Sequence, residues 1–385
     1  MEEIKEQRIQ SIDVIRGISI FGILIVNMYS YHSTAFYVNP IYMEKNELDQ
    51  WTWWFTDVFF QASFYPLFAI LFGFGLAVQM DRIRKRGESI WPPMLRRLLF
   101  LLLIGLIHAI FLWSGDILVV YAVLGFLFLP AARMKAKNLF RTALLLYILP
   151  SFFLLIFGSQ LNGKILDETI AQQIERAEES ALIYKEGSFM EVTGVRFKEW
   201  AVTNGEGAII LFILVYPLIL FGASLAKSGI LHSTEKSKKV FKNLLFATLP
   251  LGLLFKISPY VEGHIGSELL QDLIGGPLLS IAYFAAIILL VSKGKRKILS
   301  YIANVGRMSL SNYIFQSVIC TTFFYGYGFG LFGEVSYFEG TMIAIGIYVL
   351  QIFVSNHWLK KYHQGPLEAI WRQFTYLVHI KMKKG

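Results

Sequence analysis

His108 and Asp116 are the residues whose types and spacing most directly suggest catalysis. His108 lies about two-thirds of the way along an apolar stretch, and Asp116 follows after a tight turn at Ser114 and Gly115. Histidine is the commonest general base at physiological pH, and a nearby carboxylate can orient its ring and stabilise the imidazolium. A structural role is the alternative, in which His108 bonds a backbone carbonyl and Asp116 caps the helix that begins at Ile117. The spacing alone favours neither role.

A second polar group interrupts the first apolar stretch, RIQSIDVIRGISIFGILIVN, residues 8–27. Asp13 and Arg16 are three residues apart, so one turn of a helix places them side by side. Asn27 follows Arg16 by eleven residues, about three turns, and falls on the same face near the other end. A charge at the centre of a bilayer costs roughly 3 kcal/mol, so such residues face a bundle interior or a watery cavity. This face is predicted to form the wall of a polar site.

The second apolar stretch carries a polar stripe of its own. Asp57, Gln61 and Tyr65 recur at four-residue steps, and Pro66 is expected to kink the helix beside them. Gly73 and Gly75 follow, and the sequence favours a role for both in close helix packing. Asp57 and Gln61 are therefore candidate ligand-binding residues.

A third polar region is ANVGRMSLSNYIFQS, residues 303–317. Arg307 is expected at the inner interface, where it could either snorkel to headgroups or bind a phosphate or carboxylate opposite Arg16. Asn312 and Gln316 share a face that continues toward the midplane, where they need polar partners. We therefore favour anion binding. The candidate substrate-binding residues are Asp13, Arg16, Asp57, Gln61, Arg307, Asn312 and Gln316.

Membrane-spanning helices are the elements that must position these residues. Of the 385 residues, 55% are hydrophobic and 16% charged, and the apolar ones come in long blocks. A helix needs about 20 apolar residues to cross the hydrocarbon core. The blocks predict an all-α polytopic bundle of about ten transmembrane helices. They lie at 12–30, 54–79, 94–113, 117–132, 140–158, 207–226, 241–257, 271–291, 300–324 and 338–358.

The positions of Lys and Arg predict the orientation of this bundle. Positive charges concentrate in cytoplasmic loops. With the N-terminus inside, most of the 36 basic residues fall in predicted inner segments. No cleavage pattern follows the first apolar stretch, so a cleaved signal peptide is not expected. Both termini are predicted to be cytoplasmic, and the net charge of +9 then requires no nucleic acid.

The longest hydrophilic segment divides the chain. Residues 160–205 are mildly acidic with apolar residues at helical spacing, which predicts a partly helical extracytoplasmic insertion over the outer face. It separates an N-terminal five-span half, 1–159, from a C-terminal five-span half, 206–360. In 361–385 an interfacial helix starting at Pro366 is expected on the anionic inner leaflet, followed by a basic tail.

Metal chemistry is not expected. The single cysteine, Cys320, lies within a predicted span and cannot form a thiolate cluster. The remaining histidines, apart from His108, show no metal-ligand spacing, and His32 is expected in a solvated loop. We therefore predict no metal site.

Five motifs resemble the YeiB-like family of bacterial membrane proteins, also catalogued as domain-of-unknown-function family 418. They are RIQSIDVIRGISIFGILIVNM, LFAILFGFGL, RRLLFLLLIGLIHAIFLWSGDILVVYAVLG, VGRMSLSNYIFQS and HWLKKYHQGPLEAIWRQFTY. The resemblance runs from about residue 8 to 376 and implies a multi-pass protein of the bacterial cytoplasmic membrane. The opening motif is also similar to that of heparan-α-glucosaminide N-acetyltransferase-like membrane acyltransferases. Those enzymes move an acetyl group from cytosolic acetyl-CoA to an amine across the membrane.

This second similarity implies roles for particular residues. In those acyltransferases an asparagine and a histidine beyond the first span are catalytic; Asn27 matches the asparagine, but His32 follows too closely to match the histidine. His108 with Asp116 would instead deprotonate an acceptor amine or hydroxyl, while Asn27 and Asn312 would stabilise the oxyanion.

The same similarity implies acyl-CoA as the acyl donor. Its phosphates would dock at an inner mouth, where four arginines are expected to gather and where arginine forks suit anion recognition. The pantetheine arm would then reach outward between the spans. The arginines are Arg16, Arg96, Arg97 and Arg307.

Other functions stay open from the sequence, including whether the protein is an enzyme at all. Polar residues at two depths and a kinked second span would also line the path of a small-molecule transporter, although no inverted repeat is evident. A structural or sensory partner of another envelope protein is supported only by the acidic segment. The expected partners are the lipid bilayer and a small-molecule substrate. The oligomeric state, a homo-oligomer included, is not determined.

Overall fold

The computed structural model describes residues 2–40, 46–158, 160, 163–231, 234–262, 265–294, 297–377 and 382. Part of the predicted basic tail, 378–381 and 383–385, lies outside them. The described residues form helices and connecting turns, with no β-strand. The α-helices are α1 (Glu2–His32), α2 (Glu47–Phe59), α3 (Phe64–Lys85), α4 (Trp91–Phe111), α5 (Leu118–Ala131), α6 (Ala136–Gly158), α7 (Gly163–Glu186), α8 (Phe189–Ala201), α9 (Ala208–Ser228), α10 (Glu235–Glu262), α11 (Ile265–Leu270), α12 (Gly276–Ser292), α13 (Lys297–Arg307), α14 (Ser309–Phe324), α15 (Tyr337–Lys361) and α16 (Pro366–Tyr376). A short 3-10 helix, η1 (Thr34–Phe36), and two π-helical segments, η3 (Val202–Glu206) and η4 (Gln271–Gly275), join some of them.

The predicted all-α polytopic membrane bundle is confirmed. In the described part of the chain, eight helical segments are long and apolar enough to cross a membrane. The other two predicted spans correspond to α5, a shorter apolar helix of 14 residues, and α14, of 16 residues. Large hydrophobic side chains are exposed along α4, α6 and α15, as expected of surfaces that face lipid.

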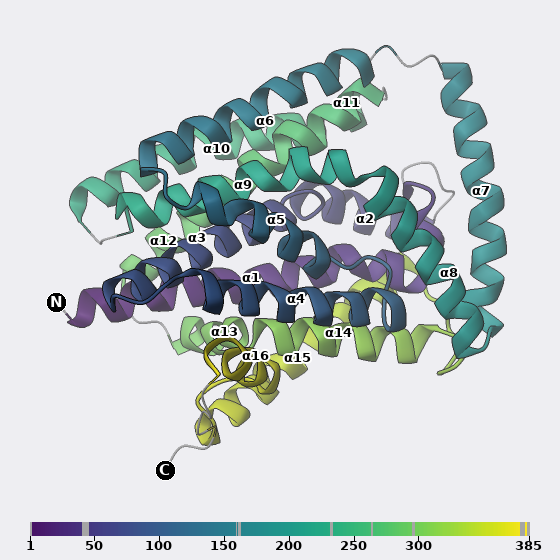
Figure 1. Ribbon diagram of the computed structural model, residues 1–385. Coiled ribbons are helices and arrows are strands. Elements are labelled where there is room, and N and C mark those ends of the chain that lie inside the picture. Colours follow the sequence, from purple (N-terminus) through teal and green to yellow (C-terminus); the bar gives the residue numbers. More distant parts are fainter. Residues whose placement is uncertain are drawn as a thin grey trace.

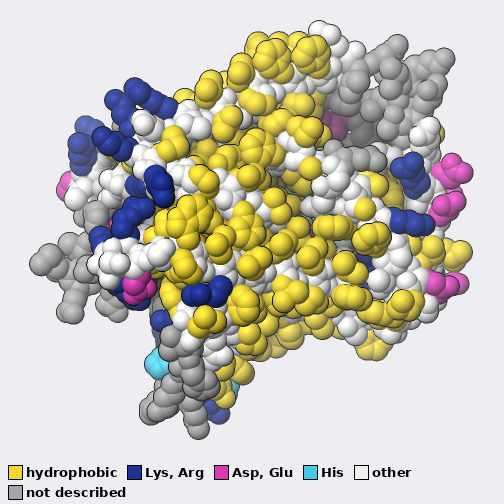
Figure 2. All heavy atoms as spheres, in the orientation of Figure 1, with side chains coloured by type: hydrophobic (Ala, Val, Ile, Leu, Met, Phe, Trp, Pro, Cys, Tyr) yellow, Lys and Arg dark blue, Asp and Glu magenta, His cyan; other side chains and the backbone are white. Residues whose placement is uncertain are grey.

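Charged side chains gather at the two ends of the bundle. In Figure 2 the middle of the visible face is covered by hydrophobic side chains, with mostly Lys and Arg at its left end and Asp and Glu together with some Lys and Arg at its right. α1 begins at the left end, and α16 lies toward it, whereas α7 stands at the right (Figure 1). We call these the basic end and the far end. On the predicted topology the basic end faces the cytoplasm.

The second predicted span is two helices, which corrects the expectation of one helix kinked at Pro66. α2 ends at Phe59 and α3 begins at Phe64, with Ala62 at a φ of +53° between them. Distant helices satisfy the carbonyl groups freed by the break. Tyr283 donates to Phe59 O at 2.8 Å, Lys256 to Gln61 O at 3.1 Å, and Ser280 to Ser63 O. Irregular backbone at membrane depth is tolerated when buried protein groups pair it in this way.

The ninth predicted span is also broken, between α13 and α14 at Met308. The carboxylate of Glu368 on α16 accepts hydrogen bonds from Leu310 N at 2.8 Å and Ser311 N at 3.0 Å, so it caps the start of α14. α16 starts at Pro366 as predicted. It is held against the bundle by this cap and by the Trp371 indole, which donates to Arg97 O at 2.8 Å.

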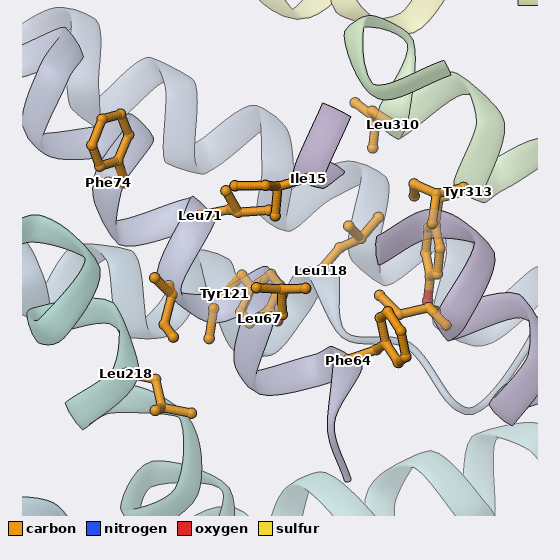
Figure 3. Close-up of a cluster of buried hydrophobic side chains, with 14 of the residues drawn as sticks. Ile15, Phe64, Leu67, Leu71, Phe74, Leu118, Tyr121, Leu218, Leu310 and Tyr313 are labelled. Carbon is orange, nitrogen blue, oxygen red and sulfur yellow. The ribbon is translucent and has the colours of Figure 1, made fainter. Parts of the chain in front are cut away.

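Small residues allow the helices of the core to approach closely. A Cβ added at Gly73 of α3 would lie 1.9 Å from Ile219 O of α9, and one added at Gly222 of α9 would lie 1.9 Å from Ile70 O of α3. Such reciprocal contacts are typical of helix pairs in membranes. Around this crossing Leu67, Leu71, Tyr121 and Leu218 form part of the buried apolar cluster (Figure 3).

The predicted insertion at 160–205 is helical where it is described. α7 is followed by α8, whose first turn has a capping box formed by Ser188 and Glu191. α8 packs against α4 and carries two buried charged side chains, Arg196 and Glu199. The insertion is therefore joined to the bundle at the far end.

Candidate functional site

The structure places His108 in a chain of four hydrogen-bonded side chains. His108 Nδ1 lies 2.8 Å from Asp116 Oδ1, and His108 Nε2 lies 2.7 Å from Ser317 Oγ. Ser317 Oγ is in turn 2.6 Å from the Tyr31 hydroxyl. The side chains of His108 and Asp116 have no solvent exposure. The order carboxylate, imidazole, hydroxyl is the order of a nucleophilic triad.

Local structure explains how His108 and Asp116 meet. α4 ends at Phe111, and the turn to α5 returns the chain so that Asp116 faces the imidazole eight residues earlier. Asp116 Oδ2 also accepts from Val119 N at 2.8 Å, which caps α5. The carboxylate therefore fills both roles considered from the sequence at once, one with each oxygen.

One direction of hydrogen donation satisfies all of these contacts. When Nδ1–H of His108 donates to Asp116, Nε2 is an acceptor and receives the Ser317 hydroxyl proton. Ser317 Oγ then accepts from Tyr31. The Tyr31 ring is held against Trp113 at a centroid distance of 4.3 Å. Every polar atom named here has a partner, so the chain is stable in a dry interior.

A cavity of about 830 Å³ leads from the basic end toward this chain. Part of its wall is apolar, with Leu71, Leu76 and Leu101 among the lining residues. At the deep end lie Ile117 and Tyr313; Ile117 follows Asp116 directly, and the Tyr313 ring packs on His108 at a centroid distance of 5.0 Å. Arg97 and His108 are eleven residues apart on α4, so they are about 17 Å apart along the helix. The cavity therefore links the basic end to the surroundings of His108.

Arginines dominate the mouth of the cavity. Arg97 lies over the Trp371 ring, 3.6 Å from its centroid. Arg307 donates to Asn304 Oδ1 and to His363 O, and Arg16 pairs with Asp13 at 3.1 Å. The six arginines that line the cavity are Arg16, Arg82, Arg86, Arg97, Arg307 and Arg372. Arg96, which the sequence placed with them, donates instead to Thr375 O.

Four buried polar atoms in the lining lack a hydrogen-bond partner within the described part of the chain. They are Gln79 Oε1, Arg97 Nε, the Tyr313 hydroxyl and Gln364 Nε2. Buried polar groups normally have partners, so unpaired ones on a cavity wall indicate that water or a polar ligand completes them. A second cavity of about 960 Å³ at the basic end shares Arg16 and Arg82 with the first.

Asn27 is half-buried on α1 and makes no hydrogen bond to the His108 chain in the described residues. It lies between a residue of α1 that lines the cavity and a residue of α1 that belongs to the His108 chain. Ile23, four residues earlier, lines the cavity, and Tyr31, four residues later, bonds Ser317. Residues four apart share a helix face, so this face of α1 runs from the cavity to the buried chain.

Asp57 and Gln61, which the sequence indicated as candidate ligand-binding residues, do not join this site. Asp57 Oδ2 accepts from Tyr260 at 2.8 Å and from Gln271 at 2.5 Å. Gln61 lies in the break between α2 and α3, so the expected stripe does not share one helix face. Asp57 therefore belongs to a separate buried cluster between α2, α10 and η4.

Asn312 and Gln316 hold helices together and do not line the cavity. Asn312 Nδ2 donates to Val305 O at 3.1 Å and to Ser355 Oγ at 3.0 Å. Gln316 Nε2 donates to Gln351 Oε1 at 2.9 Å. Their polar partners are thus supplied by α13 and α15, and the oxyanion role considered for Asn312 has no support in this geometry.

His32 is buried, contrary to the expected solvated loop. α1 continues to His32, whose side chain has no exposure and packs near Tyr29, Phe324 and Tyr337. The described residues contain no group of three or more His, Cys, Asp or Glu that could hold a metal ion. No spacing in the sequence indicates Ser317, Tyr31 and Tyr313, whose roles depend on partners far away in the chain.

α8 clamps the turn that carries Asp116. Arg196 Nη1 donates to Phe111 O at 2.9 Å and to Leu112 O at 2.7 Å, at the end of α4. Glu199 accepts from Ser114 at 2.5 Å, two residues before Asp116. Burial raises the pKa of Glu199 above its ordinary value, while hydrogen bonds from Ser114, Tyr37 and Tyr184 oppose that rise.

We expect Arg196→Ala to destabilise this end of the molecule. The substitution leaves Phe111 O and Leu112 O without their donor, which costs about 2 to 4 kcal/mol for charge-assisted bonds to buried groups. Thermal unfolding in detergent should show a lower Tm, and hydrogen exchange should rise over residues 108–119. Lys198→Ala, at an exposed position of the same helix, is the control and should change neither. Unchanged exchange in the turn would show that α8 does not hold it.

Comparison with known proteins shows relatives along the whole chain. A family model described as a protein of unknown function, DUF418, matches residues 225–378. The uncharacterised protein YxaH of Bacillus subtilis is 35% identical over 96% of this chain and 95% of its own length. The uncharacterised protein YeiB of Escherichia coli is 30% identical over 96% of each chain. No solved structure matches. The chain therefore belongs to the YeiB-like DUF418 family of membrane proteins.

Proposed function

We propose that this protein is a transmembrane acyltransferase. It takes an acyl group from acyl-CoA at the basic end and passes it to an amine or hydroxyl acceptor that approaches from the far end. The observation that carries the proposal is the arginine-lined cavity that reaches Tyr313, whose ring packs on His108. Neither the arginines nor the buried His108 would support this function alone, because arginines are common at membrane interfaces and buried histidines are often structural.

The cavity suits a CoA thioester along its whole length. The arginines supply forked donors for phosphate oxygens, and the unpaired atoms of Gln79, Arg97 and Gln364 supply further polar contacts. The apolar part of the wall suits the pantetheine arm, whose extended length is comparable with the separation of Arg97 and His108. The thioester would then lie beside Tyr313.

The groups at the deep end suit acyl transfer. His108 is the general base, and Asp116 orients its ring and stabilises the imidazolium that forms. Zero exposure of both side chains excludes bulk water, which limits hydrolysis of the acyl donor. Asn27 would donate to the oxyanion from the face of α1 that runs between Ile23 and Tyr31.

The test uses the purified protein in detergent with acetyl-CoA as the probe. We expect acetyl-CoA to raise the Tm and radiolabelled acetyl to pass to an added amine or hydroxyl acceptor. A panel of longer acyl-CoAs identifies the preferred chain. If no acyl-CoA binds, and solutes cross proteoliposomes without acyl-CoA, the proposal is wrong and the protein is a transporter.

Gly75 offers a test of the cavity alone. A Cβ at Gly75 would meet only Arg16 Nη2, at 3.5 Å, and Gly75 lines both cavities. We expect Gly75→Leu to keep the wild-type Tm but to fill the passage, raising the Kd for acetyl-CoA at least about tenfold, or about 1.4 kcal/mol.

Gly73→Ala is the matched control for this substitution, because its Cβ would collide with Ile219 O. It should lower the Tm, with overpacking costing about 1 to 3 kcal/mol. Calorimetric titration and thermal unfolding measure both variants. Wild-type acetyl-CoA affinity in Gly75→Leu would show that the donor does not use this cavity.

A further inference from the structure

We propose that Ser317 is the nucleophile of the transfer and that the protein passes through an acyl-serine intermediate. The inference rests on the proposed function, because acyl-CoA is the donor. It goes beyond that function by assigning a covalent site to a residue of α14. Transfer then takes place in two half-reactions, with the acyl group held on the protein between them.

Geometry favours Ser317 over Ser309, a serine that lines the cavity. Ser317 Oγ lies 2.7 Å from His108 Nε2, the nitrogen opposite the one that Asp116 holds. Ser309 has no contact with His108 in the described residues. A serine becomes nucleophilic when an adjacent base takes its proton and a third group orients that base. Ser317 meets both conditions.

The Tyr31 hydroxyl is a positioning group for this serine. It lies 2.6 Å from Ser317 Oγ, and its donation leaves the serine proton free to point at His108. Stacking on Trp113 holds the tyrosine ring in place. Tyr31→Phe should therefore slow acylation of Ser317 without changing the affinity for acetyl-CoA.

The first half-reaction balances without any further reactant. Ser317 Oγ attacks the thioester carbonyl carbon while its proton passes to His108 Nε2. The C–S bond breaks, and the CoA thiolate takes the proton from the imidazolium. An ester on Ser317 and free CoA result.

The second half-reaction reverses the proton path. The acceptor amine or hydroxyl gives its proton to His108 as it attacks the ester carbonyl. The C–O bond to Ser317 breaks, and Ser317 Oγ takes the proton back. The resting hydrogen-bond chain is restored, and the acceptor leaves acylated.

Tyr313 stands where the acyl group must pass. It lines the cavity, its ring packs on His108, and it lies one helical turn before Ser317. The ring must move aside for the thioester carbonyl to reach Ser317 Oγ. A covalent intermediate suits such an enclosed site, because donor and acceptor need never occupy it together and can arrive from opposite ends in turn.

The experiment asks whether label remains on the denatured protein. Purified protein is incubated with radiolabelled acetyl-CoA in the absence of acceptor, quenched in acid and mapped by peptide mass spectrometry. We expect one acetyl group per chain on the peptide that contains Ser317, released by alkali, with free CoA formed in equal amount. Adding acceptor should discharge the label.

Three variants give the controls. Ser317→Ala should bind acetyl-CoA with wild-type affinity but take no label, and transfer should fall to background. Thr321→Ala removes another buried hydroxyl one turn further along α14 and should be labelled normally. Ser317→Cys keeps a nucleophile of similar size, and its thioester should be released by neutral hydroxylamine. It serves as the test if the alanine variant does not fold.

The outcomes separate this inference from the proposed function. If Ser317→Ala transfers acetyl at the wild-type rate, or the label maps to another residue, the acyl-serine is wrong while the acyltransferase stands. If the wild-type protein transfers acetyl but never holds label, even under rapid quench, transfer is direct and the acyl-serine is wrong. If the protein binds no acyl-CoA, both fail together.

Discussion

We expect His108→Ala to lower the kcat of acyl transfer by about 10²- to 10⁴-fold, the contribution typical of a general base. The KM for acyl-CoA should change little, because His108 lies beyond the deep end of the cavity and Arg97, at the mouth, is about 17 Å away along α4. A loss in kcat at constant KM is the signature of an interaction made in the transition state. Steady-state kinetics with the preferred acyl-CoA measures both constants.

Asp116→Asn separates the two roles of that carboxylate. Asparagine keeps an acceptor for Val119 N, so the cap of α5 and the Tm should be largely retained. When the amide oxygen caps α5, the amide nitrogen faces Nδ1 as a donor, so the imidazole carries its proton on Nε2 and cannot accept the Ser317 proton there. Transfer should fall in kcat although the fold persists.

Equal activity in His108→Ala and wild type would remove the general base from the mechanism. A Tm loss in Asp116→Asn as large as that of Arg196→Ala, with kcat unchanged in the protein that remains folded, would show that Asp116 is only a helix cap. A His108→Gln variant provides a second comparison, because it retains a polar group for Ser317 but cannot accept a proton at neutral pH.

Those parts of the fold that depend on local composition could be predicted. The block at 140–158 became α6 (Ala136–Gly158), and the helix start at Pro366 is where the sequence placed it. An apolar run of about 20 residues has no other satisfactory conformation in a bilayer, since its backbone must bond within the segment. Long-range contacts are not needed for that step.

The helix breaks could not be predicted, because their stability depends on distant residues. The carbonyl of Gln61 is satisfied by Lys256, which is 195 positions away, and the start of α14 is capped by Glu368 from α16. No local feature of the sequence distinguishes a helix that can break at these positions from one that cannot. Pro66 lies in the first turn of α3, where proline is tolerated, so this local signal lies close to the break but does not reveal that the helix ends before it.

The candidate site likewise has residues that could be predicted from the sequence and residues that could not. His108 and Asp116 are eight positions apart, so a turn between two helices brings them together and the pair could be found from the sequence. Ser317 is 209 positions from His108, and no spacing rule connects them. The sequence does not distinguish Gly73 from Gly75, yet Gly73 packs closely against α9 whereas Gly75 lines a cavity. Only the packing of α3 separates these roles.

We expect Arg82→Ala and Arg307→Ala each to weaken acetyl-CoA binding about tenfold while leaving kcat nearly unchanged. Both side chains are exposed and line the cavity, so their removal does not unfold the bundle. A hydrogen bond to a charged group contributes about 1.5 to 3 kcal/mol, and 1.4 kcal/mol corresponds to tenfold in Kd. Arg16 is a poorer choice, because removing it leaves the buried Asp13 without its partner.

Salt dependence distinguishes phosphate binding from a general effect of charge. Binding of a polyanion by exposed arginines weakens as ionic strength rises, and each lost arginine should make that dependence shallower. Arg141→Ala, at an exposed position of α6 outside both cavities, removes the same charge and should leave the Kd and its salt dependence unchanged. If Arg141→Ala weakens binding as much as Arg307→Ala, the donor is attracted by overall charge and the cavity mouth is not its site. A loss in kcat with constant KM in the Arg307 variant would instead place that arginine in the chemical step and contradict its assignment to the phosphates.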